Sequence, residues 1–322
     1  MEKTILYQNK KIFYRSIGSG DPVMLVHGFG EDGNVWRPPQ TPPTEGLSNS
    51  QPWLFETHSL INKFKFIIPD LPGSGQSEMI EDMSMEGMAE VLHTIIHEEM
   101  PPQTPPKEGL AATQSRHDEN SLQKINSKSS ASSKVPPSGG FRGAGCTVIG
   151  HSMGGYVTLA LVESYWNHVN AFGLFHSSAF ADTEEKKETR KKGIEFIKQH
   201  GAFEFLKTTT PNLFSPNSKL QIPNSIDEFI NSLKNLTPQA LIAYYNSMMD
   251  RPDRTSILKN TKNPVLFVAG EYDNAIPLND VLKQCHLPEK SYIHVLKKSG
   301  HMGMMEEAKN ANRIVEEFLL EK

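Results

Sequence analysis

Short apolar runs alternate with longer amphipathic stretches along most of this chain. The runs contain few polar residues, which is typical of strands that are buried on both faces of a sheet. The predicted strands are Lys3–Gln8, Lys11–Ile17, Val23–Val26, Lys65–Ile68, Thr147–Ile149, Ala171–Phe175, Val265–Ala269 and Tyr292–Leu296. The predicted helices are Trp53–Lys63, Met85–Glu99, Met153–Trp166 and Met304–Leu320. Because strands alternate with helices, we expect βαβ crossovers and an α/β fold with a mostly parallel sheet.

Two parts of the chain depart from this alternation. Asn9 and Lys10 separate the first two strands and predict a hairpin turn. Residues 181–259 are predicted to form several successive helices, separated by prolines at positions 211, 216, 223 and 238. We therefore expect an α/β core formed by residues 1–180 and 260–322, with residues 181–259 as a helical cap over one end of the sheet.

A proline-rich repeat occurs twice, as PPQTPPTEGL from Pro38 and as PPQTPPKEGL from Pro101. Proline lacks an N–H donor and has a fixed φ, so neither copy favours a helix or a central strand. The second copy continues into a tract rich in Ser, Asn, Gln and Lys, which has too few apolar residues to form a core. We interpret residues 37–52 and 100–143 as insertions into surface connections. Ordered loops and a proline-motif docking site are the alternatives.

The composition of the 322-residue chain narrows the possible partners. Its formal net charge of −4 predicts neither nucleic acid nor an anionic membrane as a partner. The N-terminus lacks the apolar stretch of a secretory signal, and no apolar run approaches the roughly 18 residues of a transmembrane helix. Two cysteines, Cys146 and Cys285, do not make a disulfide framework. These features favour a cytoplasmic protein, and they leave its oligomeric state open.

The strongest chemical signal is Gly150-His151-Ser152-Met153-Gly154-Gly155, between a predicted strand and a predicted helix. A turn this tight needs small flanking residues and presents the central side chain above the sheet. A serine hydroxyl needs a base to act as a nucleophile, and His301 follows the last predicted strand. Asp273 follows the strand Val265–Ala269 and is the candidate carboxylate that orients the base. Glu271, Asp250 and Asp253 are alternative carboxylates.

A further glycine-rich turn, His27-Gly28-Phe29-Gly30, follows the predicted strand Val23–Val26. Glycines allow the backbone to curl so that an N–H points at a developing oxyanion. We expect the backbone N–H groups of Phe29 and Met153 to form this oxyanion hole. The same turn matches G-x-G-x-x-G through Gly33, so a dinucleotide site is an alternative interpretation.

The motifs HGFG (27–30), DLPGSGQS (70–77), GHSMGG (150–155), GEYD (270–273) and GH (300–301) resemble those of the α/β-hydrolase superfamily. The chain looks most like its small cytoplasmic esterases, enol-lactonases and C–C hydrolases. The resemblance implies an eight-stranded, mostly parallel sheet, no metal or organic cofactor, and an acyl-enzyme mechanism on a small-molecule acyl substrate. Ser152 would then be the nucleophile, His301 the general base and acid, and Asp273 the orienting carboxylate.

We expect His151, beside Ser152, His176, at the end of the strand Ala171–Phe175, and Met302, beside His301, to contact the substrate. A structural hydrogen bond is the alternative for His176, and core packing is the alternative for Met302. Hydrolysis of an ester, thioester or lactone is the first functional hypothesis. Carbon–carbon cleavage, lyase or acyl-transfer chemistry by the same three residues is the second, and a ligand receptor with a vestigial site is the third. His93 and His97 are spaced like helical zinc ligands, but the glutamate of the HExxH motif is absent because residue 94 is threonine.

The interpretation of the second repeat as an insertion can be tested by deletion. Removing Pro101–Gly140 is expected to change the free energy of unfolding by less than about 1 kcal/mol, because loop-closure entropy depends weakly on loop length. The melting temperature and the esterase activity should therefore stay close to those of the full chain. A collapse of either quantity would show that the tract is part of the folded domain.

Overall fold

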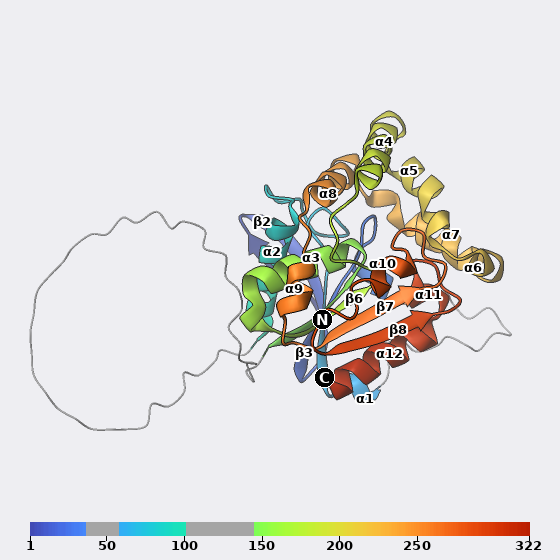
Figure 1. Cartoon of the computed structure of the whole chain (residues 1–322). Helices are drawn as coiled ribbons and strands as arrows, with labels where there is room; N and C mark the ends of the chain where they lie inside the picture. Colours follow the sequence, from blue (N-terminus) through green and yellow to red (C-terminus); the bar gives the residue numbers. More distant parts are fainter. Residues whose placement is uncertain (37–57, 101–144) are drawn as a thin grey trace, which may run out of the picture.

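The computed structural model describes residues 1–36, 58–100 and 145–322, and Figure 1 shows their arrangement. Its strands form one eight-stranded sheet in the order β1-β2-β4-β3-β5-β6-β7-β8. The strands are β1 (Glu2–Tyr7), β2 (Lys10–Gly18), β3 (Asp21–Val26), β4 (Phe64–Pro69), β5 (Cys146–His151), β6 (Val169–Phe175), β7 (Val265–Gly270) and β8 (Ser291–Leu296). All eight predicted strands are present, each displaced by no more than a few residues. The predicted fold class is confirmed.

The sheet is parallel from β4 through β3 to β8, and β2 is antiparallel to both β1 and β4. The first hairpin turns at Gln8 and Asn9, which both have positive φ (49° and 62°), and not at Asn9 and Lys10 as predicted. Two successive residues with positive φ match the twist of the flanking strands, and asparagine tolerates this conformation well. The predicted turn was therefore one residue too late.

Apolar strand residues pack alternately into two cores, one on each face of the sheet. Met24 and Val26 belong to one core, whereas Val23 and Leu25 belong to the other. The first core also contains residues of α2 (Met85–Glu99), α3 (Met153–Tyr165), α9 (Thr255–Asn260) and α10 (Leu278–Leu282). The second contains residues of α1 (His58–Ile61), α11 (Gly303–Glu306) and α12 (Ala308–Glu321). Burial on both faces explains why the central strands are almost entirely apolar.

Two of the predicted helices differ from the observed ones. The predicted final helix is divided into α11 and α12 at Glu307, which has non-helical dihedrals (φ −132°, ψ 48°). Its carboxylate accepts hydrogen bonds from Lys298 N–H and the Ser299 hydroxyl, which holds it against the loop that follows β8. Of the predicted helix Trp53–Lys63, the structure describes α1, and residues 53–57 lie outside the described ranges.

The connection between β6 and β7 consists largely of helices. They are α4 (Glu184–His200), α5 (Ala202–Thr209), α6 (Pro216–Gln221), α7 (Pro223–Ser232), α8 (Pro238–Asp250) and α9, with short 3-10 turns at Thr210–Leu213 and Leu233–Asn235. Pro216, Pro223 and Pro238 each occupy the first position of a helix, where a missing N–H costs no hydrogen bond. Figure 1 shows α4 to α8 grouped together at one end of the molecule. These helices occupy the residues predicted as a cap.

The predicted insertions at 37–52 and 100–143 lie outside the described residues, apart from Met100. Within the described ranges, no helix combines the length and apolar character that crossing a membrane requires. Cys146 and Cys285 are both buried and unpaired.

The buried carboxylate of Glu99 joins the end of α2 to three strands. Its oxygens accept hydrogen bonds from Lys3 (2.6 Å), the Tyr14 hydroxyl (2.9 Å), Ser16 (3.3 Å) and Lys65 (3.3 Å). Burial opposes its ionisation, but the bonds from Lys3, Tyr14 and Lys65 outweigh burial and lower the pKa of Glu99. The charged form of Glu99 therefore stabilises the N-terminal edge of the sheet.

Replacing Glu99 by Gln is expected to lower the free energy of unfolding by about 1.5–3 kcal/mol at neutral pH, because charged hydrogen bonds are lost. A carboxyl group with a lowered pKa stabilises the fold above its unfolded pKa, about 4.3. The difference between wild type and E99Q should therefore shrink as the pH falls from this value through the lower pKa of folded Glu99, because the unfolded chain binds the proton more readily than the folded protein. Urea denaturation of both proteins between pH 7 and pH 3 measures this difference in unfolding free energy. E98Q, at an exposed neighbouring position, should show no comparable loss; a loss equal to that of E99Q would contradict the assignment.

Candidate active site

Ser152 occupies a strained turn between β5 and α3. Its φ of 50° and ψ of −117° lie outside the regions that side chains normally adopt. The turn is held by a hydrogen bond from Ser152 N–H to Phe175 O (3.0 Å) and by one from the Ser177 hydroxyl to Ser152 O (2.7 Å). A Cβ atom at Gly150 would lie only 2.3 Å from the Gly154 oxygen. The glycines thus allow a turn that projects Ser152 beyond the end of β5.

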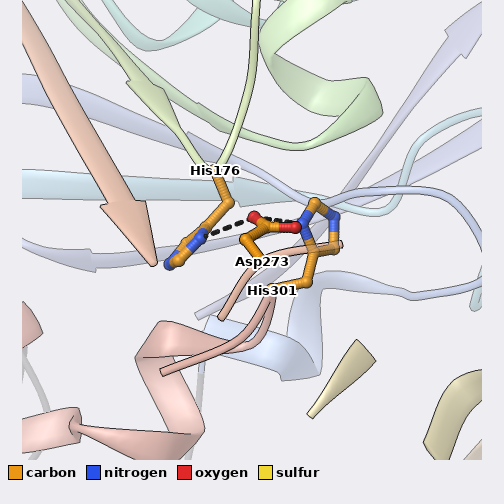
Figure 2. Close-up of side chains that lie close together, drawn as sticks. All are labelled: His176, Asp273 and His301. Carbon is orange, nitrogen blue, oxygen red and sulfur yellow. Dashed lines mark hydrogen bonds and ion pairs between the residues drawn. The ribbon is translucent and has the colours of Figure 1, made fainter. Parts of the chain in front are cut away.

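Asp273 and His301 form a buried hydrogen-bonded pair in the loops after β7 and β8. The His301 Nδ1 donates to Asp273 Oδ2 over 2.8 Å (Figure 2). The other oxygen, Oδ1, accepts from the N–H groups of Ala275 (2.9 Å) and Ile276 (2.8 Å). Burial opposes charge on Asp273 and His301 alike. Their mutual attraction outweighs it, so the pKa of Asp273 is held well below its usual range and the pKa of His301 is raised.

His151 connects the serine turn to the loop that carries His301. Its ring lies 4.9 Å from the His301 ring, centroid to centroid, and its Nε2 donates to the backbone oxygen of His301 over 3.0 Å. Ser152 follows His151 directly, so the predicted nucleophile and base belong to one cluster. The Ser152 hydroxyl has no hydrogen-bond partner among the residues that the structure describes. Bonds between a nucleophile and its base are often loose without substrate.

Among the acidic alternatives, the structure brings only Asp273 to His301. Glu271 points to solvent within the same loop, and Asp250 and Asp253 lie at the exposed end of α8 and just after it. The choice of Asp273 as the partner of His301 therefore agrees with the observed geometry.

The predicted oxyanion loop lies directly beside Ser152. A Cβ atom added to Gly28 would lie 3.1 Å from the Ser152 Cβ. His27 fixes the loop because its Nε2 accepts from Leu71 N–H (2.9 Å), so its Nδ1 carries the proton donated to Gly28 O (2.9 Å). Met153 begins α3, and the first N–H groups of a helix have no intrahelical acceptor. Backbone donors of both segments are therefore available next to the serine.

Glu31 is a buried acid whose role the sequence motifs do not reveal. Its Oε2 accepts from Gly28 N–H (2.7 Å) and lies 3.0 Å from the His151 Nδ1. Burial opposes its ionisation, but the His151 ring and the Gly28 N–H outweigh burial and lower the pKa of Glu31. A histidine before Ser152 and an acid after the HGFG turn are the only sequence signals of this contact.

The three side chains predicted to contact substrate are buried. His151, His176 and Met302 are each 0% exposed. Both ring nitrogens of His151 face protein oxygens, His176 binds Asp273 through its Nδ1 (3.0 Å), and Met302 packs into the core that contains α12. These contacts give the three side chains structural partners, and direct contact with a substrate stays a prediction.

A cavity of about 100 Å³ lies between the oxyanion loop and the helical segment. It is lined mainly by apolar side chains, including Phe29, Leu206, Leu213 and Phe229. The Phe29 ring also stacks on Tyr245 of α8 at 4.4 Å. Leu213 connects this cavity to His301, because its backbone oxygen accepts from His301 N–H (2.6 Å).

The donor atoms of His176, Asp273 and His301 are close enough together to hold a metal ion. Hydrogen bonds occupy these atoms, however, because both rings donate to Asp273. The other metal alternative, His93 and His97, has ring centroids 6.5 Å apart, and His93 Nε2 instead lies 2.7 Å from His168 Nδ1. The geometry of both groups is explained by hydrogen bonding.

The G-x-G-x-x-G match leads into a four-residue 3-10 helix, Gly33–Trp36. A dinucleotide-binding motif opens an α-helix whose N-terminus binds the pyrophosphate. Within residues 1–36, the turn is therefore not followed by the α-helix on which the dinucleotide interpretation depends.

The model of the alpha/beta hydrolase family matches residues 23–313, which is most of the chain, and this protein belongs to that family. The fold is shared with an esterase from Thermogutta terrifontis, which is 23% identical with a TM-score of 0.74 over 99% of this chain and 98% of that one. It is also shared with an enol-lactonase from Burkholderia xenovorans LB400, which is 15% identical with a TM-score of 0.73 over 99% of this chain and 100% of that one.

One curated protein shows sequence similarity over a shorter segment. It is a pimeloyl-(acyl-carrier protein) methyl ester esterase from Methylococcus capsulatus, 33% identical over 78 residues. The match spans 24% of this chain and 24% of that relative, about a quarter of each.

The steric argument for the serine turn predicts a large effect of G150A. The added methyl group would collide with backbone atoms, so unfolding free energy should fall by about 3 kcal/mol or more. G201A is the matched control, because Gly201 has a φ of 87° and nothing within 4 Å of an added Cβ. That variant should lose only the preference of glycine for this backbone conformation (φ 87°, ψ 166°), about 1–3 kcal/mol. Urea denaturation gives the unfolding free energies of G150A and G201A. Equal losses in the two variants would contradict the steric explanation.

Proposed function

We propose that this protein is a serine hydrolase that cleaves a carboxylic ester, thioester or lactone through an acyl-enzyme. The observation that carries the proposal is the convergence of three features at one end of the sheet. They are the strained Ser152 turn, the buried Asp273–His301 pair and the adjoining glycine loop. Membership of the alpha/beta hydrolase family supports it.

In the proposed reaction, the Ser152 oxygen attacks the substrate carbonyl carbon while its proton passes to His301 Nε2. Asp273 accepts from the opposite ring nitrogen and stabilises the imidazolium that forms. The carbonyl oxygen becomes an oxyanion, which the N–H groups of Phe29 and Met153 stabilise. The imidazolium then protonates the leaving oxygen or sulfur, and the bond to it breaks.

The second half of the reaction reverses these roles. His301 removes a proton from water, and the resulting hydroxide oxygen attacks the acyl carbon. The bond to the Ser152 oxygen breaks, His301 returns the proton to the serine, and the acid leaves. The raised pKa of His301, which Asp273 causes against the effect of burial, suits a group that must hold a proton between the two steps.

The apolar lining of the cavity beside Phe29 supports a substrate with a small apolar group. The proteins similar to this chain act on related bonds by their descriptions, since they include esterases and an enol-lactonase. An ester or lactone is therefore the substrate class that these observations favour over carbon–carbon cleavage or acyl transfer.

The proposal is tested with a fluorophosphonate probe and p-nitrophenyl acetate. Wild type should be labelled at Ser152 and should hydrolyse the ester, because both reactions need an activated hydroxyl. S152A should lose labelling and show a kcat reduced on the order of 10⁴-fold or more, with little change in melting temperature. S232A removes an exposed serine at the end of α7 and should behave like wild type.

Unlabelled, folded wild type would refute the serine mechanism and favour a ligand receptor. Full turnover by S152A would refute the nucleophile assignment. Labelling without hydrolysis across a panel of esters, thioesters and lactones would favour the carbon–carbon, lyase or acyl-transfer alternatives.

A further inference from the structure

His176 binds the same carboxylate oxygen as the proposed base. Its Nδ1 lies 3.0 Å from Asp273 Oδ2, which also accepts from His301 Nδ1 over 2.8 Å. Figure 2 shows the carboxylate between the two rings, with a dashed line to each. The other oxygen accepts from the N–H groups of Ala275 and Ile276. A carboxylate has about four acceptor positions, so this one has a donor for each.

The hydrogen bonds define the protonation of His176. An ionised carboxylate only accepts, so the ring must donate from Nδ1. Its Nε2 is buried without a hydrogen-bond partner in the described part of the chain. A proton on that nitrogen would be a buried, unpaired donor, which favours the neutral ring. Burial also lowers the pKa of His176, despite the nearby charge of Asp273.

The observed position of the His176 ring depends on two structurally demanding features. His176 has a φ of 49°, in the left-handed region that non-glycine residues avoid, and such strain costs about 1–3 kcal/mol. A Cβ atom at residue 303 would also lie 2.4 Å from the His176 Nε2, and 2.4 Å from the Leu296 Cδ1, so glycine at this position leaves room for the ring. A ring that contributed only packing would require neither feature. Both indicate that the bond to Asp273 is the reason for the ring.

We propose that His176 is a positioning residue that holds Asp273 Oδ2 in place and, by sharing this atom with His301, lowers the basicity of His301. Two donors on one oxygen divide its negative charge, so the bond to each is weaker than a single bond would be. The assignment of His301 as the base rests on the proposed function. The hydrogen bonds of both rings to Asp273 Oδ2 are independent of it.

Other charged or titratable groups face His301 from three further elements. Glu31 acts from the oxyanion loop, and His151 lies beside the ring at the end of β5. Glu306 of α11 accepts from the N–H groups of Gly300 and Met302, on either side of His301. None of these groups forms a hydrogen bond with His176. A substitution of His176 therefore acts on His301 mainly through the hydrogen bonding of Asp273 Oδ2.

The experiment measures the pKa of His301 by NMR titration of its ring in wild type, H176L and H176N. Leucine removes the donor, so the pKa of His301 should rise by about 0.5–1 unit. Asparagine places an N–H near the position of Nδ1 and tolerates positive φ, so its value should stay within about 0.3 unit of wild type. In active enzyme, the acidic limb of kcat/KM should move to higher pH by the same amount in H176L alone.

An unchanged pKa of His301 in folded H176L would overturn the proposal, as would equal shifts in both variants. If H176L does not fold, the ring-nitrogen NMR spectra of wild type test the proposal. Both rings must be Nδ1–H tautomers, and a proton on His176 Nε2 would overturn the proposal. These measurements need no turnover. A protein that fails the fluorophosphonate test but shows the shift would refute the proposed function and leave the role of His176 standing.

Discussion

The buried charge of Asp273 is the constraint on which the arrangement of the site depends. A buried carboxylate is costly unless every acceptor position is used, and here four N–H groups use them. The donors come from three parts of the chain: the loop after β7, the end of β6 and the loop after β8. These segments can meet only if β6, β7 and β8 keep their parallel register. The charge therefore links the order of the sheet to the position of His301.

Backbone strain is concentrated at the ends of two neighbouring strands. Ser152 follows β5 and His176 follows β6, and their φ values are 50° and 49°. The two turns support each other, because Ser152 N–H donates to Phe175 O and the Ser177 hydroxyl donates to Ser152 O. His176 N–H in turn donates to Val268 O of β7 (2.8 Å). Strained conformations persist only where the surroundings determine them fully, and three adjacent buried strands supply that rigidity.

The strands and the serine turn could be predicted because their causes are local. Apolar runs follow from burial on both faces, and the turn needs small residues close to Ser152 in sequence. The roles of Glu31 and His176 could not be predicted, because each depends on a contact with a residue far along the chain, His151 or Asp273. The same applies to the break at Glu307, whose side chain binds the preceding loop. The position of His176 at the end of a predicted strand indicated that it lies near the site, but not that it faces the Asp273 carboxylate.

The helical segment between β6 and β7 also contributes to the position of His301, the proposed base. The backbone oxygen of Leu213 accepts from His301 N–H (2.6 Å), and Ser215 N–H donates to Glu306 (2.7 Å). On the opposite side, the Tyr244 hydroxyl of α8 donates to Pro72 O (2.5 Å) in the loop after β4. The segment that borders the apolar cavity is therefore joined to the loop of His301 by a backbone hydrogen bond. A change in its packing would alter the cavity and the imidazole together, which couples the proposed substrate space to the geometry of His301.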